Sequence, residues 1–156
     1  MKMIKYINCI ALIFMTAILF AQNHRGIADG CELPDSDELG YLYITDTGDV
    51  LYKSPEAIGG WQFTVDGATV NSASGGDTAI NGLFAQSMGS TVLAFSLTGG
   101  FIPAGCGTLI SLSLSGSLIG LGDIIVSDVN GQAIEFEYYQ ENSSDCAEGT
   151  VATYDD

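Results

Sequence analysis

The most regular hydrophobic pattern in the chain lies between Thr91 and Gly116, where large apolar residues alternate with small or polar ones. Thr91–Thr98 and Thr108–Ser115 both repeat with period two, which is typical of strands with one buried face. Glycines and Pro103 interrupt the pattern between them and predict a loop. We therefore expect two central strands whose larger side chains face the core: Leu93, Phe95, Leu97, Ile110, Leu112 and Leu114.

Similar but shorter patterns predict the other strands. They cover Tyr41–Thr45, Asp49–Lys53, Ile58–Asp66, Ala68–Ser72, Leu83–Met88, Ile124–Asp128 and Ala133–Tyr139. Glycines bound a predicted loop at residues 75–82, and Asn130-Gly131 is a strong hairpin signal. We find no helical pattern beyond the N-terminal segment. About eight or nine short strands predict an all-β fold. A two-layer antiparallel β-sandwich is favoured over a barrel, because several strands have one polar face.

The first predicted hairpin has two alternative registers. A two-residue turn at Thr47-Gly48 places Tyr43 opposite Tyr52 and makes a flat strip with Tyr41, on which sugar rings could stack. With a three-residue turn, Asp46-Thr47-Gly48, only two of the three tyrosines, Tyr41 and Tyr43, face solvent. Its core face holds the other large residues: Leu42, Ile44, Val50 and Tyr52. A one-residue shift reverses the faces, so both registers cannot hold. We favour the three-residue turn because it separates polar from apolar residues better, which makes Tyr41 and Tyr43 the candidate ligand-binding residues.

The first 21 residues predict a secretory signal peptide. Lys2 and Lys5 precede an apolar segment from Ile7 to Phe20, and the small residue Ala21 follows. The segment is short for a membrane span, although an uncleaved membrane anchor is the alternative. The rest of the chain divides into a polar lead-in at residues 22–39, the sandwich at 40–139 and an acidic tail at 140–156. We therefore expect a secreted protein that is no longer attached to the membrane after signal cleavage.

Charge restricts the partners of such a protein. The formal net charge is −15, and signal cleavage leaves Arg25 and Lys53 as the basic residues against 19 acidic ones. This excess of negative charge disfavours nucleic acid and anionic membrane surfaces as partners. In a host that glycosylates, Asn142-Ser143-Ser144 is an acceptor pattern for N-glycosylation.

Three cysteines remain after signal cleavage, namely Cys31, Cys106 and Cys146, so one of them has no partner within the chain. Export permits disulfides, and loop length barely separates the three possible pairings. Cys106 lies between two predicted core strands, whereas Cys146 lies in the polar tail. We therefore predict a Cys31–Cys106 disulfide. Cys146 is then either a free thiol or the site of a disulfide-linked dimer.

The turn Asp46-Thr47-Gly48 has the sequence of the aspartic-protease active site, where paired carboxylates activate water. Its neighbours Thr45 and Asp49 are not those usual in that class of enzyme, and short motifs arise by chance. Asp, Thr and Gly are also common turn residues. Because His24 is the single histidine, Ser-His-Asp and Cys-His sets lack a base. We interpret the tripeptide as a hairpin turn and the protein as non-enzymatic, with an aspartic-protease-like hydrolase as a remote alternative.

The sequence predicts no cofactor, although calcium is a further hypothesis. Asp46, Asp49, Asp128 and Asn130 place oxygen ligands in predicted turns, and calcium prefers such ligands. The same residues favour turns without any metal. Cysteine and histidine do not occur at the spacing that zinc sites need.

The order of these segments resembles a cohesin-type domain. The resemblance lies in Ile58–Gly67, followed by Val92–Thr98, Ile102–Gly105 and Gly107–Leu114, and it covers about residues 40–139. Cohesins and the related carbohydrate-binding modules are secreted jelly-roll β-sandwiches, so the resemblance implies an extracellular binding module. It supplies no catalytic residue, and the family's partner-binding positions do not map onto this chain residue by residue.

We therefore expect a secreted, non-enzymatic module that binds an extracellular protein or polysaccharide. A structural subunit of an extracellular matrix or filament is the alternative, since the chain is rich in Gly, Ser and Thr and has an unpaired cysteine. Size-exclusion chromatography separates the two hypotheses, because a persistent monomer weighs against the structural role.

Overall fold

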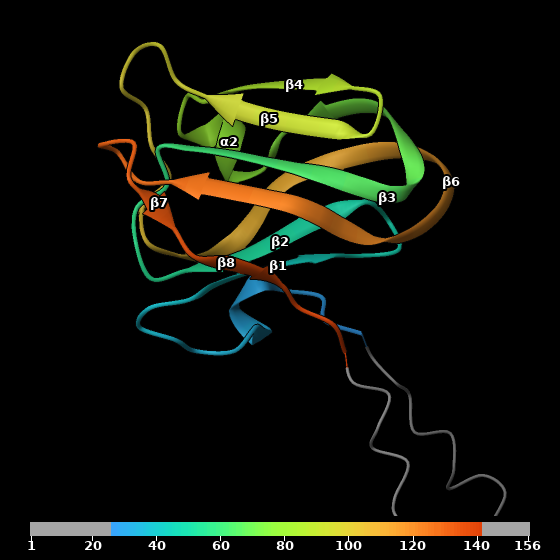
Figure 1. Cartoon of the computed structure of the whole chain (residues 1–156), viewed down its shortest axis with the longest axis horizontal. Coiled ribbons are helices and arrows are strands. Elements are labelled where there is room, and N and C mark those ends of the chain that lie inside the picture. The colour runs from blue at the N-terminus through green and yellow to red at the C-terminus, as the bar shows by residue number, and fades with distance from the viewer. Residues whose placement is uncertain (1–25, 142–156) are drawn as a thin grey trace, which may run out of the picture.

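The computed structural model describes residues 26–141, and Figure 1 shows them as a small sandwich of strands. The elements are η1 Gly30–Glu32, β1 Gly40–Ile44, β2 Asp49–Ser54, β3 Gly60–Ser74, α2 Gly76–Ile80, β4 Phe84–Met88, β5 Thr91–Phe95, β6 Gly105–Ser127, β7 Ala133–Ile134 and β8 Phe136–Tyr138. The predicted all-β sandwich is confirmed. No helix within these residues is long and apolar enough to cross a membrane. The predicted signal peptide, Asn142 and Cys146 lie outside the described residues.

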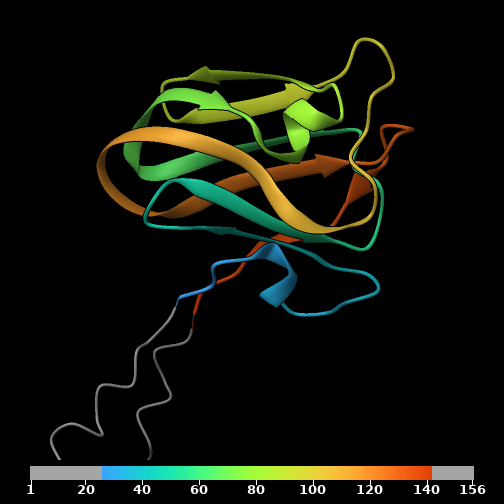
Figure 2. The same cartoon turned by 180° about the vertical axis from the view of Figure 1, so that it is seen from behind.

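The strands belong to one hydrogen-bonded sheet in the order β4-β5-β3-β6-β2-β1-β8, and β7 pairs with β6 beside it. The sheet becomes two layers because the two longest strands, β3 and β6, bend together near Gly67 and Gly116, which both have positive φ. The first layer contains β4, β5, the first half of β3 and the second half of β6. The second layer contains the remaining halves with β2, β1 and β8, as Figures 1 and 2 show from opposite sides.

The core lies between the two layers. Trp61, Phe63 and Val65 of β3 are buried, as the sequence predicts for that strand. The rings of Trp61 and Phe63 stack with their centroids 5.1 Å apart. The indole Nε1 donates a hydrogen bond to Thr78 Oγ1 (3.2 Å), which connects α2 to the core. Ile110 of β6 is fully buried, which also agrees with its predicted orientation.

The predicted orientation of Thr91–Thr98 is wrong. Val92 and Ala94 point into the core, whereas Phe95 is 38% exposed. Leu97 lies beyond the end of β5 and is 89% exposed. The larger side chains of this strand therefore lie on the outside of the sandwich.

The partner strand explains this inversion. Val92 lies opposite Phe63 and Ala94 lies opposite Trp61 in the β3–β5 register. Opposite residues share one face of a sheet, so the two smaller side chains fit beside the two large rings. Residues 92–95 are all apolar, and a period of two cannot identify the buried face when both faces are apolar.

Several segments also differ from the prediction. The single strand β3 includes most of Ile58–Asp66 and all of Ala68–Ser72. The chain forms a bulge at Gly67 and does not turn there. Thr108–Ser115 and most of Ile124–Asp128 are likewise parts of β6. The predicted loop at residues 75–82 contains α2. The sandwich is not wholly antiparallel, since β8 pairs with β1 in parallel.

The lead-in is attached to the second layer. Cys31 of η1 forms the predicted disulfide with Cys106 of β6. Lys53 Nζ donates to the backbone carbonyl of Leu33 (2.9 Å) and forms an ion pair with Asp35 (2.6 Å). Leu33 itself is 2% exposed. Residues 26–39 therefore pack against the sandwich and do not form a loose linker.

Candidate functional site

The first hairpin has the favoured three-residue turn. Leu42 lies opposite Tyr52 and Ile44 lies opposite Val50, which leaves Asp46-Thr47-Gly48 to connect the strands. Gly48 has a φ of +90°, a conformation that glycine adopts at little cost. The two-residue alternative is wrong.

The three-tyrosine strip of that alternative does not form. Tyr52 is 3% exposed, and its hydroxyl donates to Asp77 Oδ2 at 2.8 Å. Burial, reinforced by this hydrogen bond, raises the pKa of Tyr52. Tyr41 and Tyr43 lie on the outer face of β1, where both are half-buried.

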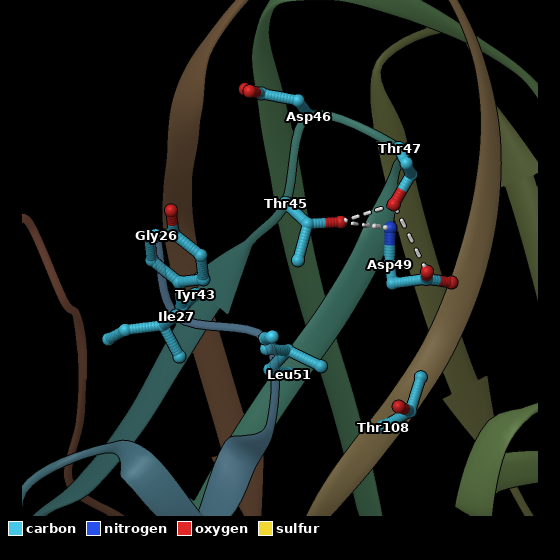
Figure 3. Close-up of a pocket in the computed structure, with 10 residues that line it drawn as sticks. Gly26, Ile27, Tyr43, Thr45, Asp46, Thr47, Asp49, Leu51 and Thr108 are labelled. Carbon is cyan, nitrogen blue, oxygen red and sulfur yellow. Dashed lines mark hydrogen bonds between the residues drawn. The ribbon is translucent and has the colours of Figure 1, made fainter. Parts of the chain in front are cut away.

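Tyr43 and the turn line a pocket of about 320 Å³ on the outside of this hairpin (Figure 3). The lead-in, β1, the turn, β2 and β6 contribute its walls: Gly26, Ile27, Ala28, Tyr43, Thr45, Asp46, Thr47, Asp49, Leu51 and Thr108. Hydroxyl groups, two carboxylates and a few aliphatic side chains face this space. They offer hydrogen-bond acceptors to a small polar group but do not form a nucleophile with an adjacent base.

Thr45, Thr47 and Asp49 form hydrogen bonds that stabilise the turn. Thr47 Oγ1 lies 2.8 Å from Thr45 Oγ1 and donates to Asp49 Oδ2 at 3.2 Å. The other oxygen of Asp49 accepts a hydrogen bond from Ser111 Oγ of β6. Figure 3 shows the Asp46 carboxylate pointing away from Asp49. A proton-sharing pair needs two carboxylates that face each other, so the geometry gives no support to aspartic-protease chemistry.

The half-buried tyrosines of β1 do not form a flat surface. Burial raises the pKa of Tyr43 to about 12, and the charge of Glu141 and a hydrogen bond to it add to the effect. Glu141 also accepts a hydrogen bond from the backbone N–H of Ile27 (2.7 Å), so Tyr43 lies close to both ends of the described chain. The ring of Tyr41 meets Tyr139 at an interplanar angle of 87°, with centroids 6.2 Å apart. Perpendicular rings do not make the level platform on which a sugar ring stacks.

The four candidate calcium ligands lie in two separate turns. Asp46 and Asp49 flank the turn between β1 and β2, whereas Asp128 and Asn130 follow β6. The backbone N–H groups of Gln132 (2.7 Å) and Asn130 (2.8 Å) donate to Asp128 Oδ1 and lower the pKa of that carboxyl. Within residues 26–141, no three acidic, histidine or cysteine side chains are placed to hold a metal ion.

An apolar surface lies on the outside of the first layer. Five residues form it, which we call the apolar face: Phe84 and Met88 of β4, Leu93 and Phe95 of β5, and Ile125 of β6. Met88 is 81% exposed and Ile125 is 60% exposed. Phe84 and Phe95 lie opposite each other and meet edge to face, with centroids 6.2 Å apart. Contiguous apolar surface of this kind marks interaction sites.

The apolar face contains a hollow above Gly60. Gly60 has no side chain and lies between Phe95 of β5 and Ser127 of β6 in the sheet register. The hollow has a volume of about 210 Å³, and Phe95 and Ile125 are among its lining residues. Gln62 and Ser127 add polar groups to the same lining. The hollow therefore combines apolar contact surface with polar groups in its lining.

Sequence reasoning missed this face. Alternation places Leu93 and Phe95 in the core and assigns Leu83–Met88 no function. Two features of the sequence indicate this face. Both faces of β5 are apolar, and Phe84 and Met88 share one face of β4. A strand with two apolar faces is either buried on both sides or carries an exposed apolar surface.

Comparison with known proteins gives a distant likeness to a solved structure. No protein-family model matches the chain, and no curated protein matches it. Among solved structures, the chain is similar to a non-cellulosomal cohesin from the hyperthermophilic archaeon Archaeoglobus fulgidus, with 14% sequence identity and a TM-score of 0.43. The match covers 64% of this chain and 83% of that one. A likeness at this level assigns no family and no role, so the function of the chain has to be argued from its own surfaces.

Proposed function

We propose that this chain is a secreted, non-enzymatic binding module that recognises a protein partner through the apolar face. One observation supports this more than any other: large apolar side chains from three strands of one layer lie at the surface of a strongly acidic protein. Each Å² of apolar surface removed from water contributes about 25 cal/mol, so an interface here would recover a substantial free energy.

The hollow above Gly60 gives this face a place for an anchoring side chain. A few apolar or aromatic anchors that fill pockets usually supply most of the binding energy of an interface. Gln62 and Ser127 are suited to the polar rim that surrounds such an anchor. We therefore expect the partner to contribute an aliphatic or aromatic side chain at this point.

Polysaccharide binding is the less supported alternative. Its candidates, Tyr41 and Tyr43, are half-buried, and Tyr43 lies against the lead-in and Glu141. The perpendicular arrangement of Tyr41 and Tyr139 also disfavours stacking on a sugar ring.

The extracellular setting is part of the same proposal. The signal-peptide pattern in residues 1–21 supports export. The disulfide between Cys31 and Cys106 also supports it, because such bonds persist in oxidising compartments.

Capture from the native extracellular fraction by the immobilised mature protein tests this proposal. Ile125→Asp places a charge in the apolar face and should reduce capture of the specific partner by about tenfold or more. Ile119→Asp is the matched control, since Ile119 also belongs to β6 and is 78% exposed but lies outside the face. An equal loss of capture in both variants, or no loss in either, would contradict the proposal.

A further inference from the structure

The outer edge of β4 is free to pair with another strand. β4 is the last strand of its layer, and among the described strands it pairs only with β5. Figures 1 and 2 show it at the outer limit of the sheet, and four of its five residues are exposed. An edge strand of this kind presents a row of backbone N–H and C=O groups that can pair with a further strand.

The two edges of the sheet differ in their protection. Natural proteins usually block an edge strand with a charge, a proline or a bulge. The sequence of β4, Phe84-Ala85-Gln86-Ser87-Met88, contains neither a charge nor a proline, and its pairing with β5 is regular. The opposite edge strand, β8, contains Glu137 and follows Glu135. The chain therefore blocks one edge and leaves the other open.

The distribution of charge indicates which partner suits the open edge. No charged residue occurs between Asp77 and Asp123, a segment that includes β4, β5 and most of β6. The net charge of −15 is carried by the rest of the chain. A second copy can approach through the neutral segment without bringing acidic groups into contact. A basic partner would find no opposite charge there.

We propose that β4 pairs antiparallel with β4 of a second copy, about a two-fold axis at Gln86. In this register Phe84 lies opposite Met88 of the second copy, and the thioether can contact the aromatic ring. Ala85 lies opposite Ser87 of the second copy, and Gln86 meets its own equivalent. The interface is self-complementary, as two-fold symmetry requires. Leu93, Phe95 and Ile125 of the apolar face stay uncovered, so this pairing and the proposed partner binding can succeed or fail separately.

The dimer should be weak, and added salt should strengthen it. A pair of five-residue strands buries less surface than a standard interface of about 1,600 Å². Two strongly acidic copies also repel each other, and salt screens that repulsion. Added salt should therefore lower the dimer Kd, whereas it would weaken binding to an oppositely charged partner.

Sedimentation of the mature protein over a wide concentration range tests the pairing. Cys146→Ser serves as the background, because it removes any disulfide-linked dimer through that residue. Gln86→Glu and Gln86→Lys each place two like charges opposite each other at the axis and should raise the dimer Kd about fivefold. An equal mixture of the two variants should restore the wild-type Kd, since opposite charges then meet.

Gln62→Glu is the control for charge alone. Gln62 lies in β3 on the same outer face, away from the axis, so this variant should leave the dimer Kd unchanged. A protein that stays monomeric at every concentration would overturn the pairing. A dimer that both Gln86 variants leave unchanged, or that their mixture does not restore, would also overturn it. Ile125→Asp should keep the dimer, which separates this test from the capture experiment.

Discussion

At the scale of single residues, Tyr52 links the first hairpin to α2 through its hydrogen bond to Asp77. Tyr52→Phe removes this bond and should lower the free energy of unfolding by about 1 kcal/mol. Urea denaturation at neutral pH measures the change. Tyr41→Phe is the control, because that side chain lies on the outer face and its substitution should change stability by less than about 0.5 kcal/mol. Equal effects of the two variants would contradict the assigned roles.

Alkaline pH gives a second measure of the environment of Tyr43 and Tyr52. Burial raises the pKa of Tyr43 from 10.0 to about 12 and raises that of Tyr52 as well. Above pH 10.0 the unfolded chain loses a phenolic proton that the folded chain retains, so stability should fall as the pH rises from 10.0 to about 12. Tyr52→Phe should make this fall shallower. A slope equal to that of the wild type would argue against the burial of Tyr52.

Alanine substitutions at two glycines with positive φ distinguish the cost of backbone strain from the cost of a steric overlap. Gly48 has a φ of +90° and Gly82 a φ of +75°. A Cβ at Gly48 would overlap the carbonyl oxygen of Leu112, whereas nothing lies within 4 Å of a Cβ at Gly82. Alanine should cost about 1 kcal/mol at either position through strain, and about 1 kcal/mol more at Gly48 through the overlap. Thermal unfolding of both variants checks this, and equal losses would contradict the packing of the turn against β6.

At the scale of elements, alternation predicts a strand well where one of its faces is polar. The register of the first hairpin and the core face of β3 follow from their sequences, because polar residues lie between Trp61, Phe63 and Val65. In β5 both faces are apolar, and the large rings of the neighbouring strand decide which face is buried. That neighbour is distant in sequence, so local pattern carries no information about it.

The candidate sites also differ in how well the sequence predicts them, because one depends on local pattern and the other on strands that are distant in sequence. Tyr41 and Tyr43 follow from local turn chemistry, which the sequence contains. The apolar face combines strands β4, β5 and β6, and the position of β3 between the last two depends on non-local pairing. The sequence predicts separate strands at Thr108–Ser115 and Ile124–Asp128, whereas bulged pairing with β3 keeps β6 continuous between them.

The lead-in provides a prediction at the same scale. The disulfide joins η1 to β6 across 75 positions, and its removal in the double variant Cys31→Ser, Cys106→Ser should cost about 2–4 kcal/mol. Residues 26–39 would then depend on Lys53 and Leu33 for their attachment. Calorimetry and limited proteolysis should show a lower Tm and new cleavage in that segment. Cys146→Ser is the control, and an unchanged Tm in the double variant would contradict the role of the disulfide.

At the scale of the whole molecule, charge and exposed apolar surface occupy different regions. Acidic residues gather in the lead-in, in the first hairpin and around β8, whereas no charge interrupts the chain from β4 through most of β6. The acidic region repels other copies and keeps the protein dispersed. The proposed edge contact lies wholly in the neutral region, and the proposed outer-face contact lies partly in it, through β4 and β5.

Site-specific photo-crosslinking in the native extracellular fraction tests the central claim most directly. A benzophenone amino acid replaces Phe95 in the apolar face or, in the matched variant, Tyr41 on the outer face of the second layer. Both positions hold an aromatic ring at the surface, so the replacements disturb the fold to a similar extent. We expect position 95 to crosslink one partner protein, identified by mass, and position 41 to give no crosslink. A crosslink from position 41 alone, or from neither position, would contradict recognition through the apolar face.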